Sequence, residues 1–259
     1  MKICSLFSGI GGLELGLEAA GVGETFWQVE QDAFCRSILA KHWPDAKRFE
    51  DVRTVGAEDI GGAELLCGGF PCQDISLAGR GGGLAGERSG LWGEYARLIR
   101  LVLPRFVIIE NVPALTGRGL SEVLGELAGC GYDAEWDTIS AAAVGACHRR
   151  NRIFIIAWLR DAADTNSISL REQQQRVQLP GGKIQAKGEA VTLDDGGKGS
   201  FRINPWQTKR GISPVDDGVP DQLVRQRALG NAVVPQVAYQ VGLRVKRLMT
   251  SVTLSSLAR

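Results

Sequence analysis

Histidine and closely spaced cysteines, the side chains that most often bind zinc, are scarce in this sequence. It contains two histidines and six cysteines among 259 residues, and no two cysteines have Cys-x-x-Cys spacing. We therefore expect no metal site. The first residues do not follow a signal-peptide pattern, so we expect a cytoplasmic, reducing compartment in which the cysteines are free thiols.

Long apolar runs and an excess of one charge are also missing. No run of about 18 apolar residues occurs, so we expect no membrane span. Lys and Arg number 30 against 29 Asp and Glu, a formal net charge of +1. This balance argues against a protein that coats nucleic acid indiscriminately, and a local basic patch stays open. The 44% of hydrophobic and 23% of charged residues exclude disordered, collagen-like and coiled-coil chains.

Up to residue 160 the chain alternates short apolar runs with helix-like stretches. Strands are expected at residues 2–7, 25–30, 65–67, 106–109, 136–139 and 153–158, and helices at 13–20, 32–41, 95–103 and 122–127. The run at 106–109 is apolar throughout, which is typical of a strand buried on both faces. This alternation predicts an α/β fold with a mostly parallel, doubly wound sheet and helices on both faces.

The character of the chain changes after residue 160. Residues 161–224 are rich in Gln, Gly, Asp and Lys and show no clear period, and a closing helix is expected at 233–249, entered through Pro235. We therefore expect one catalytic-type domain formed by residues 1–160 and 225–259. The segment 161–224 is expected to be a small irregular lobe inserted into it. Within this lobe, residues 171–210 carry eight Lys or Arg against four Asp or Glu.

A glycine-rich turn follows the first expected strand. Phe7-Ser8-Gly9-Ile10-Gly11-Gly12 joins this strand to the first helix, and Glu30 ends the second strand. Glycines let the backbone approach a ligand, the helix N-terminus offers free N–H groups, and the carboxylate could accept from ribose hydroxyls. Such turns are common, so alone the motif is weak. The spacing lacks the third glycine of the dinucleotide fingerprint, which disfavours NAD.

Cys72 lies just after the strand at 65–67, in Gly69-Phe70-Pro71-Cys72-Gln73. A buried structural role is the usual one for cysteine. However, open α/β sheets place their ligands beyond the carboxyl ends of their strands. The segment that follows carries glycines at 79, 81, 82, 83, 86 and 90, which suits a loop that closes over a substrate. The position favours an exposed, reactive thiol.

Two further polar groups stand at strand ends. Glu110 follows the apolar run at 106–109, and a carboxylate there is costly unless it is paired or functional. His148-Arg149-Arg150-Asn151-Arg152 precedes the last strand of this domain. This basic segment is either a solvated edge or a contact to phosphate or to a carbonyl group.

Together these segments resemble the cytosine-C5 DNA methyltransferase family, in the family's order and over nearly the whole chain outside the insertion. Pro-Cys-Gln, Glu-Asn-Val and Gly-Asn-Ala-Val-Val are the specific parts of the resemblance. Two departures stand out: Cys147-His148 replaces the usual Pro-Gln, and the insertion is short. The matching segments are the turn at 7–12, Glu30, Asp51-Val52, residues 69–73, 88–92, 110–112, 148–152 and 230–235.

The resemblance implies a Rossmann-like class I methyltransferase fold and methyl transfer from S-adenosylmethionine to C5 of a flipped cytosine, with S-adenosylhomocysteine as product. It implies that Cys72 adds to C6, that Glu110 binds the exocyclic amine and N3, and that Arg152 holds O2 with Arg150 near the phosphate. The insertion would be the target-recognition region. The implied cofactor residues are Phe7, Gly9, Ile10, Gly11, Gly12, Glu30, Gln31, Asp51, Val52, Gly69, Pro71, Leu91, Asn231 and Ala232.

The expected partner is double-stranded DNA, bound by a monomer in a bacterial cell, including one that carries a phage or prophage. A cognate restriction endonuclease that acts separately stays open. Three other functions were weighed. A tRNA cytosine methyltransferase shares the catalytic residues, but its insertion differs from this one. A non-catalytic DNA- or nucleotide-binding module is disfavoured because Cys72, Glu110 and Arg152 are all present. An NAD(P) oxidoreductase is disfavoured by the glycine spacing.

Overall fold

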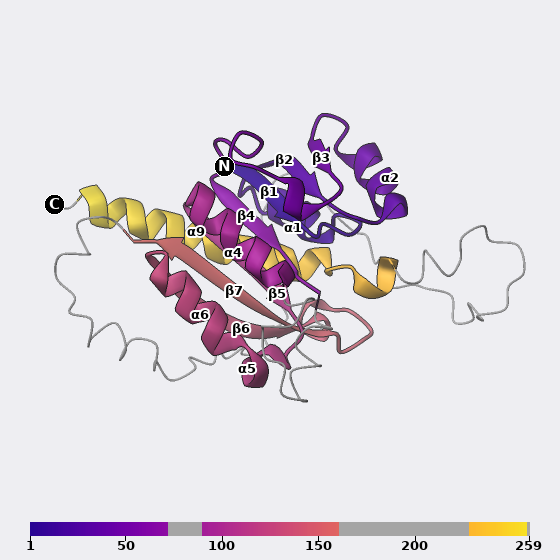
Figure 1. Cartoon of the computed structure of the whole chain (residues 1–259). Helices are drawn as coiled ribbons and strands as arrows, with labels where there is room; N and C mark the ends of the chain where they lie inside the picture. The colour runs from indigo at the N-terminus through magenta and orange to yellow at the C-terminus, as the bar shows by residue number, and fades with distance from the viewer. Residues whose placement is uncertain (72–89, 161–227, 258–259) are drawn as a thin grey trace, which may run out of the picture.

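The computed structural model describes residues 1–71, 90–160 and 228–257 (Figure 1). Cys72 and the expected target-recognition region at 161–224 lie outside the described residues. Within them, a sheet of seven strands runs through the centre of the molecule.

The strand order is β3-β2-β1-β4-β5-β7-β6. The pairs from β3 to β5 are parallel, and β7 is antiparallel to both β5 and β6. The mostly parallel α/β sheet predicted from the sequence is confirmed, whereas the short β3 and the reversed direction of β7 were not predicted. The strands are β1 (Lys2–Leu6), β2 (Glu24–Val29), β3 (Lys47–Phe49), β4 (Leu65–Gly68), β5 (Phe106–Asn111), β6 (Tyr132–Ser140) and β7 (Asn151–Leu159).

Helices cover both faces of this sheet. The α-helices are α1 (Gly12–Ala19), α2 (Ala33–His42), α4 (Gly90–Val102), α5 (Leu115–Arg118), α6 (Leu120–Gly129) and α9 (Pro235–Leu257), with short 3-10 helices η1 (Val52–Thr54) and η4 (Ala141–Val144). Apolar residues of α1 and α9 pack on one face, and those of α4 and α6 pack on the other (Figure 1). The sheet is therefore doubly wound, as predicted. The main differences are longer elements, since α4 begins at Gly90 and β6 at Tyr132.

Alternation along the strands explains the two cores. In β1, Ile3 packs toward α1 and α9, while Cys4 and Leu6 pack toward α4. All six residues of β5 are buried because helices cover both of its faces. The continuous apolar run at 106–109 was interpreted in this way from the sequence, and the structure confirms it.

Helix α9 returns the chain to α1 through very close packing. A Cβ placed on Gly16 of α1 would lie 2.4 Å from Cβ of Ala238, and one placed on Gly242 of α9 would lie 2.6 Å from Cβ of Ala20. Small residues thus let the two helix backbones approach each other. The consequence for the site is that residues 228–234, which lead into α9, lie beside the start of α1.

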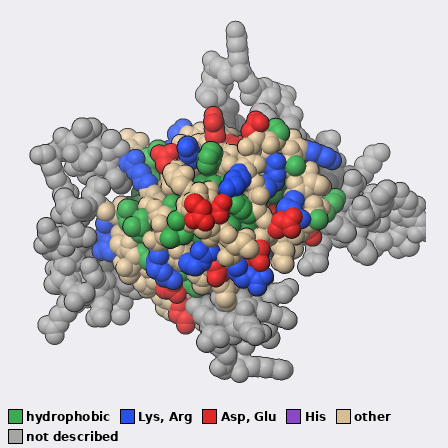
Figure 2. Space-filling model, turned by 45° about the horizontal axis from the view of Figure 1, so that its top comes forward, with side chains coloured by type: hydrophobic (Ala, Val, Ile, Leu, Met, Phe, Trp, Pro, Cys, Tyr) green, Lys and Arg blue, Asp and Glu red, His purple; other side chains and the backbone are tan. Residues whose placement is uncertain are grey.

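The surface mixes charges of both signs. On the face shown in Figure 2, Lys and Arg side chains are interspersed with Asp and Glu. In the described ranges, no helix combines the length and apolar character needed to cross a bilayer.

Candidate active site

One edge of the sheet collects the predicted site residues. β1, β4 and β5 are parallel, so their carboxyl ends meet at the same edge. β7 runs in the opposite direction, so its first residues lie at this edge, with Ile153 paired to Asn111. Open α/β sheets bind ligands at this position.

The turn from Phe7 to Gly12 has an unusual backbone. Phe7, Gly9 and Gly11 have φ values of 55°, 56° and 87°. These values lie in the left-handed region, which glycine adopts freely and phenylalanine rarely. A Cβ on Gly11 would lie 2.3 Å from the Trp43 ring, so glycine is required there for space as well as for conformation.

Glu30 fixes this turn from its outer side. Its Oε2 accepts the Gly9 N–H at 2.7 Å, and its Oε1 accepts the Asp32 N–H at 2.8 Å. The Glu30 N–H donates to the Phe49 carbonyl of β3 at 3.0 Å. Each carboxylate oxygen keeps acceptor capacity for a further donor. The next predicted residue, Gln31, is exposed, and its carbonyl accepts from Arg36 at 2.6 Å.

Asp51 follows β3 and pairs with a residue that was not predicted. Both of its carboxylate oxygens accept from the Arg53 guanidinium, at 2.8 to 3.1 Å. These bonds from Arg53 are the main reason why the pKa of Asp51 is lowered. Val52 is buried, and its carbonyl accepts from Arg97 of α4 at 3.1 Å, which ties η1 to that helix.

Apolar side chains line the same edge on the α4 side. Phe7 and Leu91 are both partly buried and pack against the core cluster on this face. The Phe7 ring centroid lies 6.4 Å from that of Tyr95, whose hydroxyl donates to the Ile108 carbonyl of β5. The ring contact between Phe7 and Tyr95 therefore joins α4 to the predicted cofactor turn.

Glu110 and Arg152 form an ion pair at the centre of the edge. Arg152 Nε lies 2.8 Å from Glu110 Oε1, and the Glu110 side chain is only 11% exposed. Burial raises the pKa of Glu110, while the charges of Arg152 and Arg150 oppose the shift. A pKa raised in this way makes proton exchange at this carboxyl accessible nearer to neutral pH. Of the two alternatives that the sequence left open, a paired or a functional carboxylate, the structure shows pairing.

Arg150 approaches from the same segment and retains free donors. It donates through Nη1 to the Gly230 carbonyl, whereas its Nε and Nη2 are buried without a partner among the described residues. Burial and the neighbouring Arg152 lower the pKa of Arg150. Two buried guanidinium donors without acceptors suit an anionic or carbonyl ligand.

Asn111 connects this edge to the segment that carries Cys72. Its amide donates to the Phe70 carbonyl at 3.1 Å, and its Oδ1 accepts the Val112 N–H at 2.8 Å. Next to it, a Cβ on Gly69 would lie 2.4 Å from Glu110 Oε2. Asn111 thereby fixes the backbone just before Pro71, which is exposed. The sequence reasoning gave Asn111 no role of its own, although its position in Glu-Asn-Val was the signal that could have shown it.

Residues 228–234, the segment that leads into α9, also lie at this edge of the sheet. A Cβ on Gly12 would lie 2.1 Å from the Val233 carbonyl oxygen, so glycine is required there for the close approach. This contact brings exposed Asn231 and partly buried Ala232 toward the turn at 7–12, which also holds partly buried Ile10. The residues Ser5, Ser8 and Glu14, discussed below, were not predicted from the sequence.

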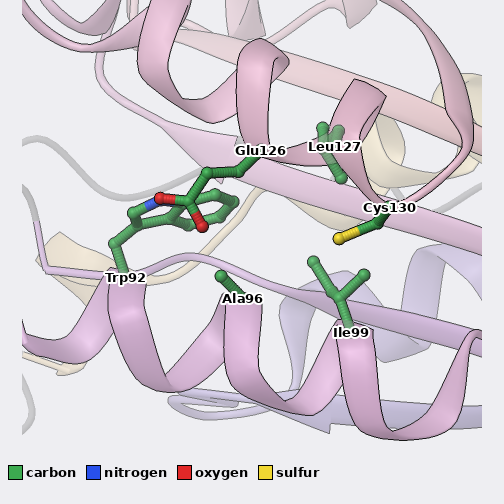
Figure 3. A pocket seen from close by; sticks show the side chains of 6 residues that line it. All are labelled: Trp92, Ala96, Ile99, Glu126, Leu127 and Cys130. Carbon is green, nitrogen blue, oxygen red and sulfur yellow. The ribbon is translucent and has the colours of Figure 1, made fainter.

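Elsewhere in the described structure, the candidate binding sites are weaker. The described residues contain no cluster of three or more His, Cys, Asp or Glu that could hold a metal ion. A shallow crevice with no room for a water molecule lies between α4 and α6, where Trp92 and Glu126 face each other (Figure 3). The Trp92 indole donates to Glu126 at 3.2 Å, so the polar groups of this crevice already bind each other.

The family model of the C-5 cytosine-specific DNA methylases matches residues 1–200. This chain belongs to that family. The match covers the turn at 7–12, Glu30 and the Glu110–Arg152 pair, and it ends before the segment at 228–234.

Type II methyltransferases are among the relatives. M2.BsuMI of Bacillus subtilis (strain 168) is 36% identical over 168 residues, which is 61% of this chain and 42% of the relative. M.NgoBI of Neisseria gonorrhoeae is 33% identical over 161 residues, which is 61% of this chain and 50% of the relative. The chain thus spans about half the length of the relatives that it matches.

Solved structures agree with the fold. A DNA modification methyltransferase encoded within a prophage (E. coli) has a TM-score of 0.52 at 28% identity, covering 65% of this chain and 49% of its own. The Entamoeba histolytica methyltransferase EhMeth has a TM-score of 0.55 at 21% identity, covering 62% and 53%. At the latter identity the likeness concerns the fold alone. The Rossmann-like arrangement predicted from the sequence is confirmed.

Proposed function

We propose that this protein is a DNA (cytosine-5-)-methyltransferase that uses S-adenosylmethionine. The observation that carries the proposal is the cluster of Glu110, Arg152 and Arg150 at the sheet edge, with Asn111 holding the backbone just before Pro71 and Cys72. This cluster offers a carboxyl group of raised pKa and two guanidinium groups, and the residue after Pro71 in the sequence is the thiol Cys72. A nucleophilic thiol and groups that bind the base suit covalent addition to a pyrimidine ring.

The thiol is the nucleophile in this proposal. The Cys72 thiolate adds to C6 of cytosine and thereby makes C5 nucleophilic enough to take a methyl group, and loss of the C5 proton then expels the thiolate. A free thiol has a pKa of about 8.5, so nearby positive charge is needed to raise the thiolate fraction. Arg150 and Arg152 supply positive charge at this edge, partly balanced by Glu110.

Glu110 and the two arginines bind the base. Glu110 forms hydrogen bonds with the exocyclic amine and N3 and thereby stabilises the charge that develops as sulfur adds to C6. Arg152 binds O2, and the unpartnered donors of Arg150 bind the neighbouring phosphate. The cytosine must leave the base stack to reach these groups, at a cost of a few kcal/mol.

The turn at 7–12 and Glu30 fit S-adenosylmethionine, which supplies an electrophilic methyl group when bound. A Cβ on Gly9 would meet no described atom within 4 Å, so the backbone there lies open to a ligand. Beside this space, Glu30 accepts from the ribose hydroxyls, Asp51 accepts from the adenine amine, and Phe7 and Leu91 provide apolar contact. Pro71 and Leu91 would line the methionine end, and Asn231 and Ala232 would contact the cofactor from the segment at 228–234.

Target recognition is assigned to residues 161–224. Their sequence carries a net charge of +4 over residues 171–210, from eight basic and four acidic residues. Phosphate contacts by such residues would position the protein, and a few Arg, Gln or Asn side chains would read base edges.

A covalent trap tests the mechanism. An oligonucleotide duplex with 5-fluorocytosine at the target cannot lose its C5 substituent, so protein and DNA should remain linked in the presence of S-adenosylmethionine. The Cys72→Ser variant should form no adduct and should retain its thermal unfolding midpoint. An adduct of equal yield with Cys72→Ser would assign the reaction to another thiol and overturn the role of Cys72.

The substrate is tested by methyl transfer from labelled S-adenosylmethionine to duplex DNA and, separately, to tRNA. We expect transfer to DNA. Transfer to tRNA alone would replace the proposed substrate and keep the chemistry, whereas transfer to neither by a folded protein would favour a non-catalytic binding module.

A further inference from the structure

A buried carboxyl group lies beneath the turn at 7–12, and the proposed chemistry does not use it. Glu14, in the first turn of α1, is 0% exposed. Neither of its oxygens has a hydrogen bond of normal geometry to a described residue. A position on a helix that is enclosed to this extent is normally apolar, because burying a carboxyl group without a cation is costly.

Two hydroxyl groups connect Glu14 to the turn. Ser5 of β1 and Ser8 of the turn lie close enough for their hydroxyls to lower the pKa of Glu14, against the larger opposing effect of burial. Ser8 Oγ lies 2.9 Å from Ser5 Oγ. Because hydroxyl groups rotate to suit their partners, Ser5, Ser8 and Glu14 can form one hydrogen-bonded set.

Ser8 lies between Phe7 and Gly9, two residues with φ values of 55° and 56°. Glycine adopts these values freely, but for Phe7 they are strained, so the turn depends on outside contacts to keep this conformation. Glu30 supplies such a contact on the outer side through the Gly9 N–H. On the inner side, the Ser8 side chain of the turn points to Ser5, with which it shares a hydrogen bond, and Glu14 lies next to both hydroxyl groups.

We infer that Glu14 is a positioning residue for S-adenosylmethionine: through Ser8 it holds the turn at 7–12 in the conformation that the cofactor binds. The inference rests on the proposed function, since it assumes that this turn binds that cofactor. Glu14 contacts no ligand itself, so its effect should appear in cofactor affinity and should disappear when Ser8 can no longer transmit it.

The test measures the Kd for S-adenosylmethionine by calorimetry on the full chain. Glu14→Leu keeps the approximate size of the side chain and removes the carboxyl group that the Ser5 and Ser8 hydroxyls can bind. The Kd for S-adenosylmethionine should therefore rise by about five- to ten-fold. Glu14→Gln retains donor and acceptor atoms, so its Kd should stay within about two-fold of the original. Equal Kd values for the original protein and a folded Glu14→Leu variant would overturn the inference.

Coupling to Ser8 separates positioning from a general loss of stability. Ser8→Ala should raise Kd to the same extent as Glu14→Leu, and the double variant should bind no more weakly than either single variant, since both act through one contact. Multiplied losses in the double variant would contradict the inference. If Glu14→Leu does not fold, Ser8→Ala alone still decides, because an unchanged Kd would exclude transmission through Ser8.

Two controls complete the design. Glu122→Leu makes the same change at an exposed carboxyl group in the first turn of α6, so its Kd should not change. Glu30→Ala should raise Kd by about ten- to hundred-fold through loss of a charged acceptor. An unchanged Kd for Glu30→Ala would refute the proposed cofactor site, whereas an effect at Glu30 without one at Glu14 would refute only the present inference.

Discussion

Carboxyl groups in this chain have very different surroundings. Glu30 accepts two backbone N–H groups, and Glu110 shares its burial with two arginines. Glu14 is fully buried, and none of the groups that shift its pKa is a cation. Burial raises the pKa of Glu14 from 4.5 to about 7. An acid with a raised pKa in the folded state binds its proton more tightly there than in the unfolded chain.

This linkage predicts how stability varies with pH. Below pH 4.5 both states hold the proton, and between 4.5 and about 7 only the folded state keeps it. The free energy of unfolding should therefore fall as pH rises through this window, by about 3 kcal/mol in total. Glu14→Gln removes the titration. Urea unfolding at pH 5 and pH 8 should show a smaller decrease for this variant, and equal decreases would contradict the prediction.

Elements in this fold are joined by small residues and by single polar bonds. α1 and α9 touch through Gly16 and Gly242, where an added Cβ would lie 2.4 and 2.6 Å from a neighbouring Cβ. β4 and β5 are joined at their carboxyl ends by the bond from Asn111 to Phe70. The contact between Arg244 of α9 and Glu135 of β6 is stronger than a single bond, because it has two hydrogen bonds of 2.6 and 2.7 Å.

The contact between α1 and α9 predicts opposite effects for one substitution at two helical glycines. Gly16→Ala should lower the free energy of unfolding by about 1–3 kcal/mol, because the methyl group forces the helices apart. Gly125→Ala in α6 is the matched control. No described atom lies within 4 Å of its added Cβ, so it should stabilise the protein by about 0.5–1 kcal/mol through helix propensity. Denaturant unfolding measures both, and equal signs would contradict the packing argument.

At the scale of the whole molecule, residues 228–257 pack against the fold formed by the first 160 residues. Residues 228–234 reach the sheet edge through contacts with Gly12 and Arg150, and the segment that we propose for target recognition lies between β7 and α9 in the sequence. Charges of both signs alternate on the face in Figure 2. For the proposed DNA substrate, phosphate contacts carry no sequence information, so side chains that contact base edges would have to discriminate between DNA sites.

If the proposed target-recognition segment reads the DNA sequence, exchanging it should transfer the choice of target sequence. If residues 165–220 are replaced by the corresponding segment of a relative, the hybrid should methylate the relative's target sequence. Bisulfite sequencing of the methylated DNA reads the outcome. Charge removal at Lys209 and Arg210 is the matched control, since it should weaken binding to all sequences and flatten the salt dependence by about one unit per lost phosphate contact. A hybrid that methylates the original sequence would place recognition in the catalytic domain.

The sequence alone determined much of the fold and of the site. Period and composition located six of the strands, because apolar runs between turn residues are local properties. The resemblance located Glu30, Glu110 and Arg152, which the structure gathers at one edge. The roles of Cys72 and of the insertion remain predictions, since they lie outside the described residues.

Contacts between segments distant in sequence were decided only by the tertiary structure. The reversed direction of β7 places Arg152 beside Glu110, and apolar runs do not encode strand direction. Burial of Glu14 was also not predictable from its helix. Residues 13–20 show an apolar stripe with Glu14 beside it, and a single stripe predicts one buried face. Because α1 packs against both the sheet and α9, more of its circumference is enclosed, and Glu14 is enclosed with it.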